Sequence, residues 1–191
     1  MEADWEIEIG GESPVIEAHW PGFVDLHLHP ERSSQLPEAA GFPALAEALE
    51  VLNAANSPVW TSKCDVWPVV DADGMDADEL DAPAGCDARA IGGYIDVLPT
   101  DERKWDSASI AAADCKGLCG RLREVPLRCC RVDLVVRQAM FDSTQMAAGS
   151  MRLGMTAYFT ACGSTEAEAA GTFQGLLGAF ARVLAARSTL E

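Results

Sequence analysis

Apolar and polar residues alternate along the first thirty residues of the chain, which is the pattern of half-buried strands. In WEIEI (5–9) a tryptophan and two isoleucines alternate with two glutamates, so one side of an extended chain is apolar. The turn residues GGES follow, and VIEAHW (15–20) can pair back on the first stretch. FVDLHLH (23–29) resumes the alternation. This region therefore predicts three strands, the first two joined as a hairpin.

Later segments show both the helical and the strand period. Apolar residues recur at helical spacing in 43–54, in 107–124 and in the segment that begins at Thr165, where Thr165 and Glu168 have the spacing of a capping box. Four further stretches are rich in β-branched and aromatic residues or alternate in polarity. They predict strands at 57–70, 92–99, 129–141 and 153–162.

The predicted elements follow the order β-β-α three times, over residues 1–56, 57–124 and 125–191. Connections that resemble hairpins favour antiparallel pairing, and the helices then pack on one face of the sheet. We therefore expect a single α+β domain over residues 1–191. It has a mainly antiparallel sheet of about six strands with three helices packed on one face. The acidic stretch 71–88 is expected to be a surface loop.

Composition limits the class of protein. Of the 191 residues, 49% are hydrophobic, which is enough for a core, yet no run of eighteen apolar residues could cross a membrane. The start, MEADWEIEIG, lacks the basic and then apolar order of a signal peptide. We therefore expect a soluble, cytoplasmic protein with no membrane partner. The seven cysteines are an odd number within apolar stretches, which favours buried free thiols over a disulfide scaffold.

The net charge of −16 is unevenly distributed. Residues 1–102 contain 22 acidic and three basic side chains, whereas residues 103–191 contain eight acidic and eleven basic ones. An acidic chain is a poor candidate for binding nucleic acid, because phosphates need a basic face. The opposite charges of the two halves favour a homo-oligomer or another protein partner.

The stretch PGFVDLHLHPE (21–31) is the clearest candidate for metal chemistry. Asp25, His27 and His29 stand at alternate positions, so a strand would place them on one face, where two imidazoles can bind one metal ion. Glu31 can add an oxygen ligand or orient a ring. The implied cofactor is a divalent metal such as zinc, and the implied activity is that of a small metal-dependent hydrolase or lyase.

Residues 21–31 resemble the first-strand motif of the amidohydrolase superfamily, in which a strand ends in Asp-x-His-x-His and both histidines bind a catalytic metal. The resemblance implies a (β/α)8 barrel with further histidines on later strands. The chain has three histidines in all, the third being His19 before the motif, and a barrel needs about 250 residues. The barrel is therefore excluded. A small metal site on another fold and a solvated strand face without metal both stay open.

A second candidate site lies where the strand predicted at 153–162 leads into the last helix. A thiol near a helix amino terminus is favoured as a thiolate, because the helix dipole and the free N–H groups stabilise the negative charge. Cys162 is therefore the candidate nucleophile of a thiol enzyme. Ser164 and Thr165 are candidates for ligand or anion binding at the same turn. A buried thiol followed by ordinary capping residues is the alternative.

A third candidate is the aromatic stretch VWTSKCDVW (59–67). Trp60 and Trp67 are seven positions apart, so a period of two places them on opposite faces of a strand. One of them can then enter the core while the other lines a pocket. Trp60, Lys63 and Trp67 are therefore candidates for ligand binding.

No phosphate-binding loop and no nucleophile-elbow motif occurs in the sequence. Abundant structural patterning with few convergent catalytic residue types favours a non-catalytic ligand-binding or protein-assembly domain. The metal-dependent hydrolase or lyase and the thiol enzyme are the two alternatives.

Overall fold

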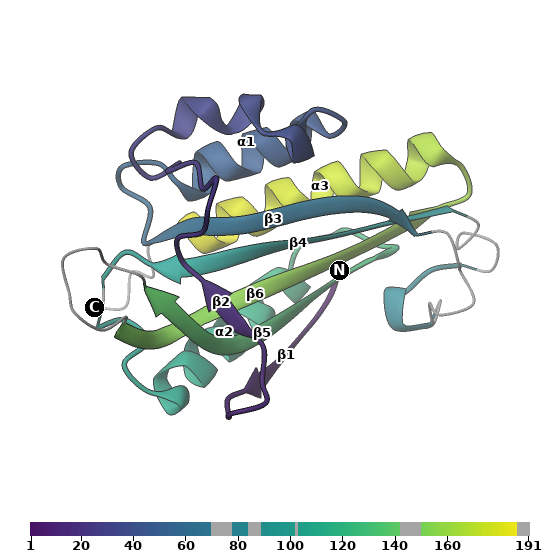
Figure 1. The fold of residues 1–191 in the computed structure, drawn as a ribbon. Helices are drawn as coiled ribbons and strands as arrows, with labels where there is room; N and C mark the ends of the chain where they lie inside the picture. Colours follow the sequence, from purple (N-terminus) through teal and green to yellow (C-terminus); the bar gives the residue numbers. More distant parts are fainter. Residues whose placement is uncertain (70–77, 84–88, 102, 142–149, 187–191) are drawn as a thin grey trace.

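The computed structural model of the chain describes residues 1–69, 78–83, 89–101, 103–141 and 150–186. Six strands form one mixed sheet and three main helices pack against it, so the fold is α+β (Figure 1). The strands are β1 (Glu2–Glu8), β2 (Val15–Glu17), β3 (Val59–Val69), β4 (Arg89–Pro99), β5 (Cys130–Phe141) and β6 (Ser150–Gly163). The helices are α1 (Pro43–Leu52), α2 (Ala108–Arg123) and α3 (Glu166–Ala185), and short 3-10 helices occur at Pro30–Gln35, Pro37–Ala39 and Asp78–Leu80.

The strand order in the sheet is β1-β5-β6-β4-β3, and β2 pairs with β5 beyond the end of β1. Both β1 and β2 run parallel to β5, whereas the β5–β6, β6–β4 and β4–β3 pairs are antiparallel. The expectation of a mainly antiparallel sheet is therefore wrong. The turn after β1 displaces the chain without reversing it, so β1 and β2 do not form the predicted hairpin. The first β-β-α unit consequently does not repeat the strand pairing of the other two.

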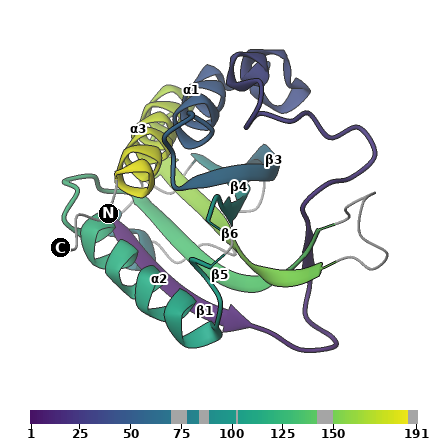
Figure 2. The same ribbon diagram turned by 90° about the vertical axis from the view of Figure 1, so that its left-hand side faces the viewer.

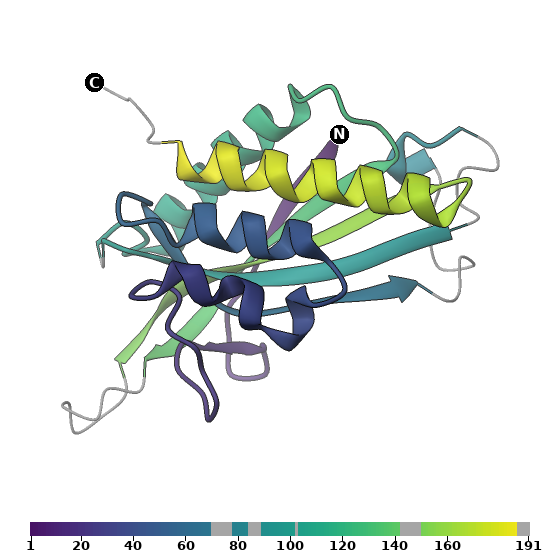
Figure 3. The ribbon, with the colours of Figure 1, turned by 90° about the horizontal axis from the view of Figure 1, so that it is seen from above.

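The helices begin where the sequence predicts. Ser107 Oγ accepts a hydrogen bond from the backbone N–H of Ile110 at the start of α2. Thr165 Oγ1 accepts one from the N–H of Glu168 at 3.2 Å, and the Glu168 carboxylate accepts one from the N–H of Ser164 at 2.9 Å, which confirms the capping box. α1 and α3 lie side by side over the sheet (Figure 3). No helix in the described ranges is long and apolar enough to span a membrane.

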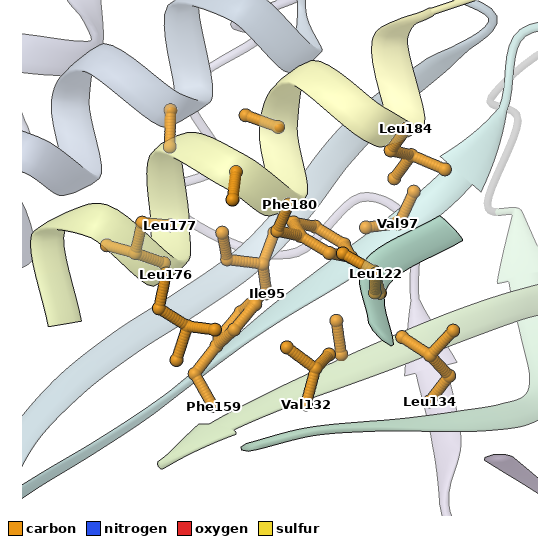
Figure 4. Close-up of a cluster of buried hydrophobic side chains, with 14 of the residues drawn as sticks. Ile95, Val97, Leu122, Val132, Leu134, Phe159, Leu176, Leu177, Phe180 and Leu184 are labelled. Atoms are coloured by element: carbon orange, nitrogen blue, oxygen red, sulfur yellow. The ribbon is translucent and has the colours of Figure 1, made fainter. Parts of the chain in front are cut away.

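The main core lies between the helices and one face of the sheet (Figure 4). At its centre Phe159 of β6 and Phe180 of α3 meet edge to face, with ring centroids 4.9 Å apart. The aliphatic side chains around this pair come from both layers: Ile95, Val97, Leu122, Val132, Leu134, Leu176 and Leu177. Alternate residues of the central strands therefore form one side of the core, and the apolar faces of the helices form the other.

The face of the sheet that points away from the helices is here called the open face (Figure 2). Because side chains alternate along a strand, the residues between the core positions point to it. One end of the open face is covered by β2 and the residue that follows it, since Ile16 and Ala18 are buried against Leu98 and Ala139. No described residue covers the middle of the open face in this way, and there its polar and aromatic side chains reach the surface.

Residues 23–29 are not the predicted strand. The Asp25 carboxylate accepts a hydrogen bond from the N–H of Leu28, and the Asp25 carbonyl accepts one from the N–H of His29, which closes a turn. Leu26 is buried but Leu28 is 69% exposed, so the apolar side of the expected strand does not form. The reason is local, since an aspartate side chain that binds backbone N–H groups favours a turn over an extended chain.

The acidic stretch 71–88 falls mostly outside the described residues. Its described part includes the 3-10 helix Asp78–Leu80, where Leu80 is 3% exposed and packs with Ala90 and Cys162. The described part in the middle of the stretch is therefore attached to the sheet by an apolar contact.

Substituting Phe180→Ala is expected to lower the free energy of unfolding by about 3–5 kcal/mol, because it leaves a cavity beside Phe159 in the buried core. Ile110→Ala is the control, since Ile110 is 46% exposed and its loss is expected to change the free energy by about 0.5 kcal/mol or less. Urea unfolding of both variants measures the difference. Equal costs would contradict the assignment of the core.

Candidate ligand-binding site

A groove on the open face is made of two hollows that share Arg137 and Tyr158. The first hollow has a volume of about 310 Å³ and lies beside β2. It is lined by Tyr94, Asp96, Thr156 and Tyr158, by Trp67 and Arg137, and by residues 14–16. The second hollow, about 430 Å³, is lined mainly by residues of β1 and β5. Both volumes are in the range of small-molecule sites.

Strand register explains why these side chains meet. Core positions of β4 alternate with Tyr94 and Asp96, which therefore point to the open face. In the antiparallel pairing of β4 with β6, Tyr158 stands opposite Tyr94 and Thr156 stands opposite Asp96. Four side chains from two neighbouring strands thus form one polar and aromatic patch in the centre of the sheet.

A chain of hydrogen bonds crosses this patch from β1 to β4. Arg137 donates to the Glu8 carboxylate through Nε at 2.9 Å and forms an ion pair with it through Nη2 at 2.8 Å, and Nη1 donates to the hydroxyl of Tyr158 at 2.7 Å. Nη1 also donates to Thr156 Oγ1 at 3.3 Å, and Thr156 donates to Asp96 Oδ1 at 2.7 Å. Each guanidinium nitrogen therefore has an oxygen within 2.9 Å, and side chains from four strands are held in place together.

Asp96 is the most unusual member of this network, because its carboxyl is buried and only 6% of the residue is exposed. Burial raises the pKa of the Asp96 carboxyl, while the bond from Thr156 and the charges of Arg137 and Lys63 lower it without cancelling the effect of burial. The folded protein thus keeps a carboxyl in a place that disfavours its charged form. Groups of this kind cost stability and gather at functional sites.

Three aromatic rings form a row across the patch. The ring centroids of Trp67 and Tyr94 are 6.3 Å apart, and those of Tyr94 and Tyr158 are 6.2 Å apart. Trp67 lies over Gly92, where a Cβ atom would come within 2.8 Å of the indole nitrogen, so the position of this ring requires the glycine. The guanidinium carbon of Arg137 lies 5.4 Å from the Tyr158 centroid. One end of the row therefore already holds a cation, and Trp67 at the other end is 40% exposed.

Carboxylates dominate the charge of the open face. By strand register, the described charged residues that point to it are Glu2, Asp4, Glu6, Glu8, Asp65, Asp96, Asp133, Arg131, Arg137 and Arg152. Burial first, and then the charges of Asp96 and Asp65, raise the pKa of Tyr94 to about 12. The Tyr94 phenol is therefore protonated at neutral pH and can donate a hydrogen bond into the first hollow.

The structure separates the three ligand candidates of β3. A β-bulge within 61–64 shifts the register, so Trp60 and Trp67 both point to the open face and the prediction of opposite faces is wrong. Trp67 lines the first hollow. Trp60 packs in an aromatic cluster under the covered end of the open face. Lys63 forms an ion pair with Glu17 of β2, outside the lining of the groove.

The predicted metal ligands lie in the turn after β2 and in the following 3-10 helix. His29 and Glu31 are exposed, with 3.3 Å between Nδ1 and Oε1, and Asp25 is hydrogen-bonded within the turn. Nδ1 of His27 is buried and has no hydrogen-bond partner in the structure. Within the described ranges, no group of three or more His, Cys, Asp or Glu residues is placed to hold a metal ion. Zinc at this stretch therefore stays a prediction from the sequence.

The candidates at the start of α3 are adjacent but differ in access. Cys162 is fully buried, in contact with Leu80 and Ala90. Ser164 and Thr165 are exposed and take part in the cap of α3, as described above. The helix start therefore uses these groups for its own hydrogen bonds, and the Cys162 thiol is not exposed to solvent.

A wider hollow, about 640 Å³, lies outside the open face. It is lined by Ala55, Asn56, Ser57, Pro58, Thr100, Asp101, Arg103 and Lys104. None of these described lining residues is aromatic, and the bond from the Arg103 N–H to the Asp101 carboxylate is a local turn contact. The groove is therefore the stronger candidate, although each of its two hollows is smaller than this one.

Sequence reasoning found Trp67 but missed the other groups of the first hollow: Tyr94, Asp96, Arg137, Thr156 and Tyr158. One signal was available, because Asp96 interrupts the apolar run of GGYIDVLP (92–99). The rest of the site depends on which strands are neighbours, and no single segment carries that information.

Comparison with known proteins adds no further constraint. No protein-family model, curated protein or solved structure matches this chain. The geometry and charge of the groove therefore carry the functional inference.

We expect Asp96→Asn to stabilise the protein at neutral pH. The pKa of this carboxyl is raised above its ordinary value of 3.8, so the folded state holds the proton more tightly than the unfolded chain. The contribution of this carboxyl to the stability of the fold is therefore greatest below pH 3.8. It falls as the pH rises through the raised pKa and stays low at pH 7.5. The expected rise in Tm at pH 7.5 is about 2–4 °C, as ~1 kcal/mol gives for a chain of this size.

The control for this prediction is Glu47→Gln, which removes the same charge from the exposed side of α1. Thermal unfolding followed by circular dichroism over a series of pH values from 7.5 down towards 3.8 measures the effect. The gain from Asp96→Asn is expected to shrink as the pH falls below the raised pKa, whereas Glu47→Gln is expected to show no such pattern. A lower Tm for Asp96→Asn at pH 7.5 would mean that the carboxylate stabilises the fold through Arg137.

The thiols are expected to be unreactive in the folded protein. Burial raises the pKa of Cys64 and Cys115 to about 12 and that of Cys119 and Cys130 to about 11, and Cys162 is fully buried. Iodoacetamide at pH 8 should leave these five residues unlabelled in native protein and label them in urea, as read by peptide mass spectrometry. Native labelling of Cys162 as fast as in urea would restore the thiol-enzyme hypothesis.

Proposed function

We propose that this chain is a non-catalytic binding protein whose ligand occupies the groove on the open face. The observation that supports this best is Asp96, an ionisable group 6% exposed at a surface hollow. A buried carboxyl disfavours folding unless it is paired, so its presence on an accessible face is better explained by a ligand than by stability.

The groups that line the groove suit binding better than catalysis. Among the described lining residues there is no histidine, cysteine, serine or lysine, so a Ser-His or Cys-His pair is missing from the groove. Arg137 is already engaged by Glu8, Thr156 and Tyr158, which suits a structural role for its guanidinium better than contact with a reacting group. What the lining offers instead is aromatic surface, hydroxyl groups and carboxylates.

The groove is also held rigid before any ligand arrives. Its side chains stand on sheet strands, and the hydrogen bonds from Glu8 through Arg137 to Asp96 link four of those strands. A preformed site loses little conformational entropy on binding. Hollows of about 310 and 430 Å³ favour a small ligand over a large protein interface.

A fragment screen by two-dimensional ¹H–¹⁵N NMR tests this proposal on the full chain. Binding fragments are expected to shift the amide signals of residues 92–96 and 156–158 and the indole signal of Trp67. Gly92→Ala should weaken these fragments about tenfold or more, because the added Cβ displaces the Trp67 ring. Gly171→Ala is the matched control, since a Cβ there meets nothing within 4 Å.

Two results would contradict the proposed function. One is a screen with no fragment that shifts the groove signals. The other is a set of fragments whose binding survives Gly92→Ala and shifts signals elsewhere, such as those of Thr100, Asp101, Arg103 and Lys104 around the wider hollow.

A further inference from the structure

We propose that the first hollow binds the ammonium group of a small organic cation, with Trp67 and Tyr94 against the cation and Asp96 as its counter-charge. This inference rests on the proposed function, because it names the ligand class of the same groove. The aromatic row, the charge of the open face, the hydrogen bonds of Asp96 and the shape of the hollow each support it.

The aromatic row already holds one cation of the protein itself. A cation within about 6 Å of a ring centroid is attracted to the negative face of the ring, most strongly for tryptophan. The guanidinium of Arg137 has this relation to Tyr158, at 5.4 Å. Tyr94 and Trp67 continue the same row, and Trp67 is 40% exposed beside the hollow. The outer rings therefore offer a second cation the same kind of surface.

The charges around the hollow disfavour an anion. Arg137 is bonded to Glu8 through two of its nitrogens, so its charge is largely compensated. Lys63 forms an ion pair with Glu17. Among the described residues that line the hollow, Arg137 is the one positive group, so an anionic ligand would meet Asp96 without an uncompensated positive charge, whereas a cation would meet a carboxylate at close range.

Asp96 has unused capacity to accept hydrogen bonds or charge. In the described part of the chain it accepts one side-chain hydrogen bond, from Thr156, whereas a carboxylate has about four acceptor positions. An ammonium group in the hollow would compensate the buried charge. Binding would then relieve the unfavourable burial of this carboxylate, which is an energetic gain that a neutral ligand does not provide.

The shape of the hollow favours a small alkylated cation. Its volume is about 310 Å³, and Pro14, Val15 and Ile16 give it an apolar wall on the β2 side. Alkyl groups on the nitrogen can pack on this wall and on the faces of the rings. A headgroup of the size of choline combines a permanent positive charge with such an apolar surface.

The test compares choline with 3,3-dimethylbutan-1-ol, which has the same shape but carbon in place of the charged nitrogen. Both are titrated into ¹⁵N-labelled protein at pH 7.5 and constant ionic strength. Choline is expected to shift the signals of residues 94–96 and the Trp67 indole and to bind at least tenfold tighter than the alcohol. Asp96→Asn and Gly92→Ala should each weaken choline at least tenfold, while Glu47→Gln and Gly171→Ala should leave it unchanged.

The outcomes separate this inference from the proposed function. Equal affinity for choline and the alcohol, or fragments that bind the groove while choline does not, would overturn the cation and leave the binding site standing. Choline binding that survives both groove variants would overturn it as well. Shifts produced by a lysine-rich peptide but not by choline would replace the small cation with a basic protein partner. If no compound binds the groove, both proposals fail.

Discussion

All three helices cover the same face of the sheet, and this constraint decides which side chains can form the groove. Each central strand must point every second residue into the core, so the residues between them face outward. Tyr94 and Asp96 reach the open face because Ile95 between them is buried under the helices. A shift of β4 by one residue would exchange core and groove, so the packing of the helices also protects the register of the site.

The parts of the fold that depend on local sequence could be predicted, and the parts that depend on distant pairing could not. Thr165 and Glu168 form the capping box that their spacing predicts, because both partners lie within one turn of α3. The direction of β1 depends instead on β5, more than a hundred residues later. Alternation at 23–29 was misleading, since the Asp25 side chain forms a turn. A β-bulge in β3 moved Trp60 onto the face of Trp67.

The candidate site could not be predicted from the sequence, because it too depends on distant strand pairing. Its hydrogen bonds join Glu8, Arg137, Thr156 and Asp96, which come from four strands and meet only when the sheet is assembled. Glu8, Arg137 and Thr156 each look like an ordinary polar position on a strand. Asp96 is marked locally by interrupting the apolar run 92–99, but its burial beside a surface hollow depends on residues of other strands.

The sheet also explains the unequal charge of the two halves of the chain. The acidic β1 runs parallel to β5, which places Glu8 beside Arg137 and Asp4 beside Arg131. Acidic and basic residues that are far apart in the sequence thus form ion pairs within one chain. The uneven charge of the two halves therefore serves contacts inside the fold. The arginines of β5 are occupied by these contacts, and Asp96 stays without a full counter-charge. The acidic half therefore both fixes Arg137 and leaves the groove with a negative centre, which is the condition that a cationic ligand requires.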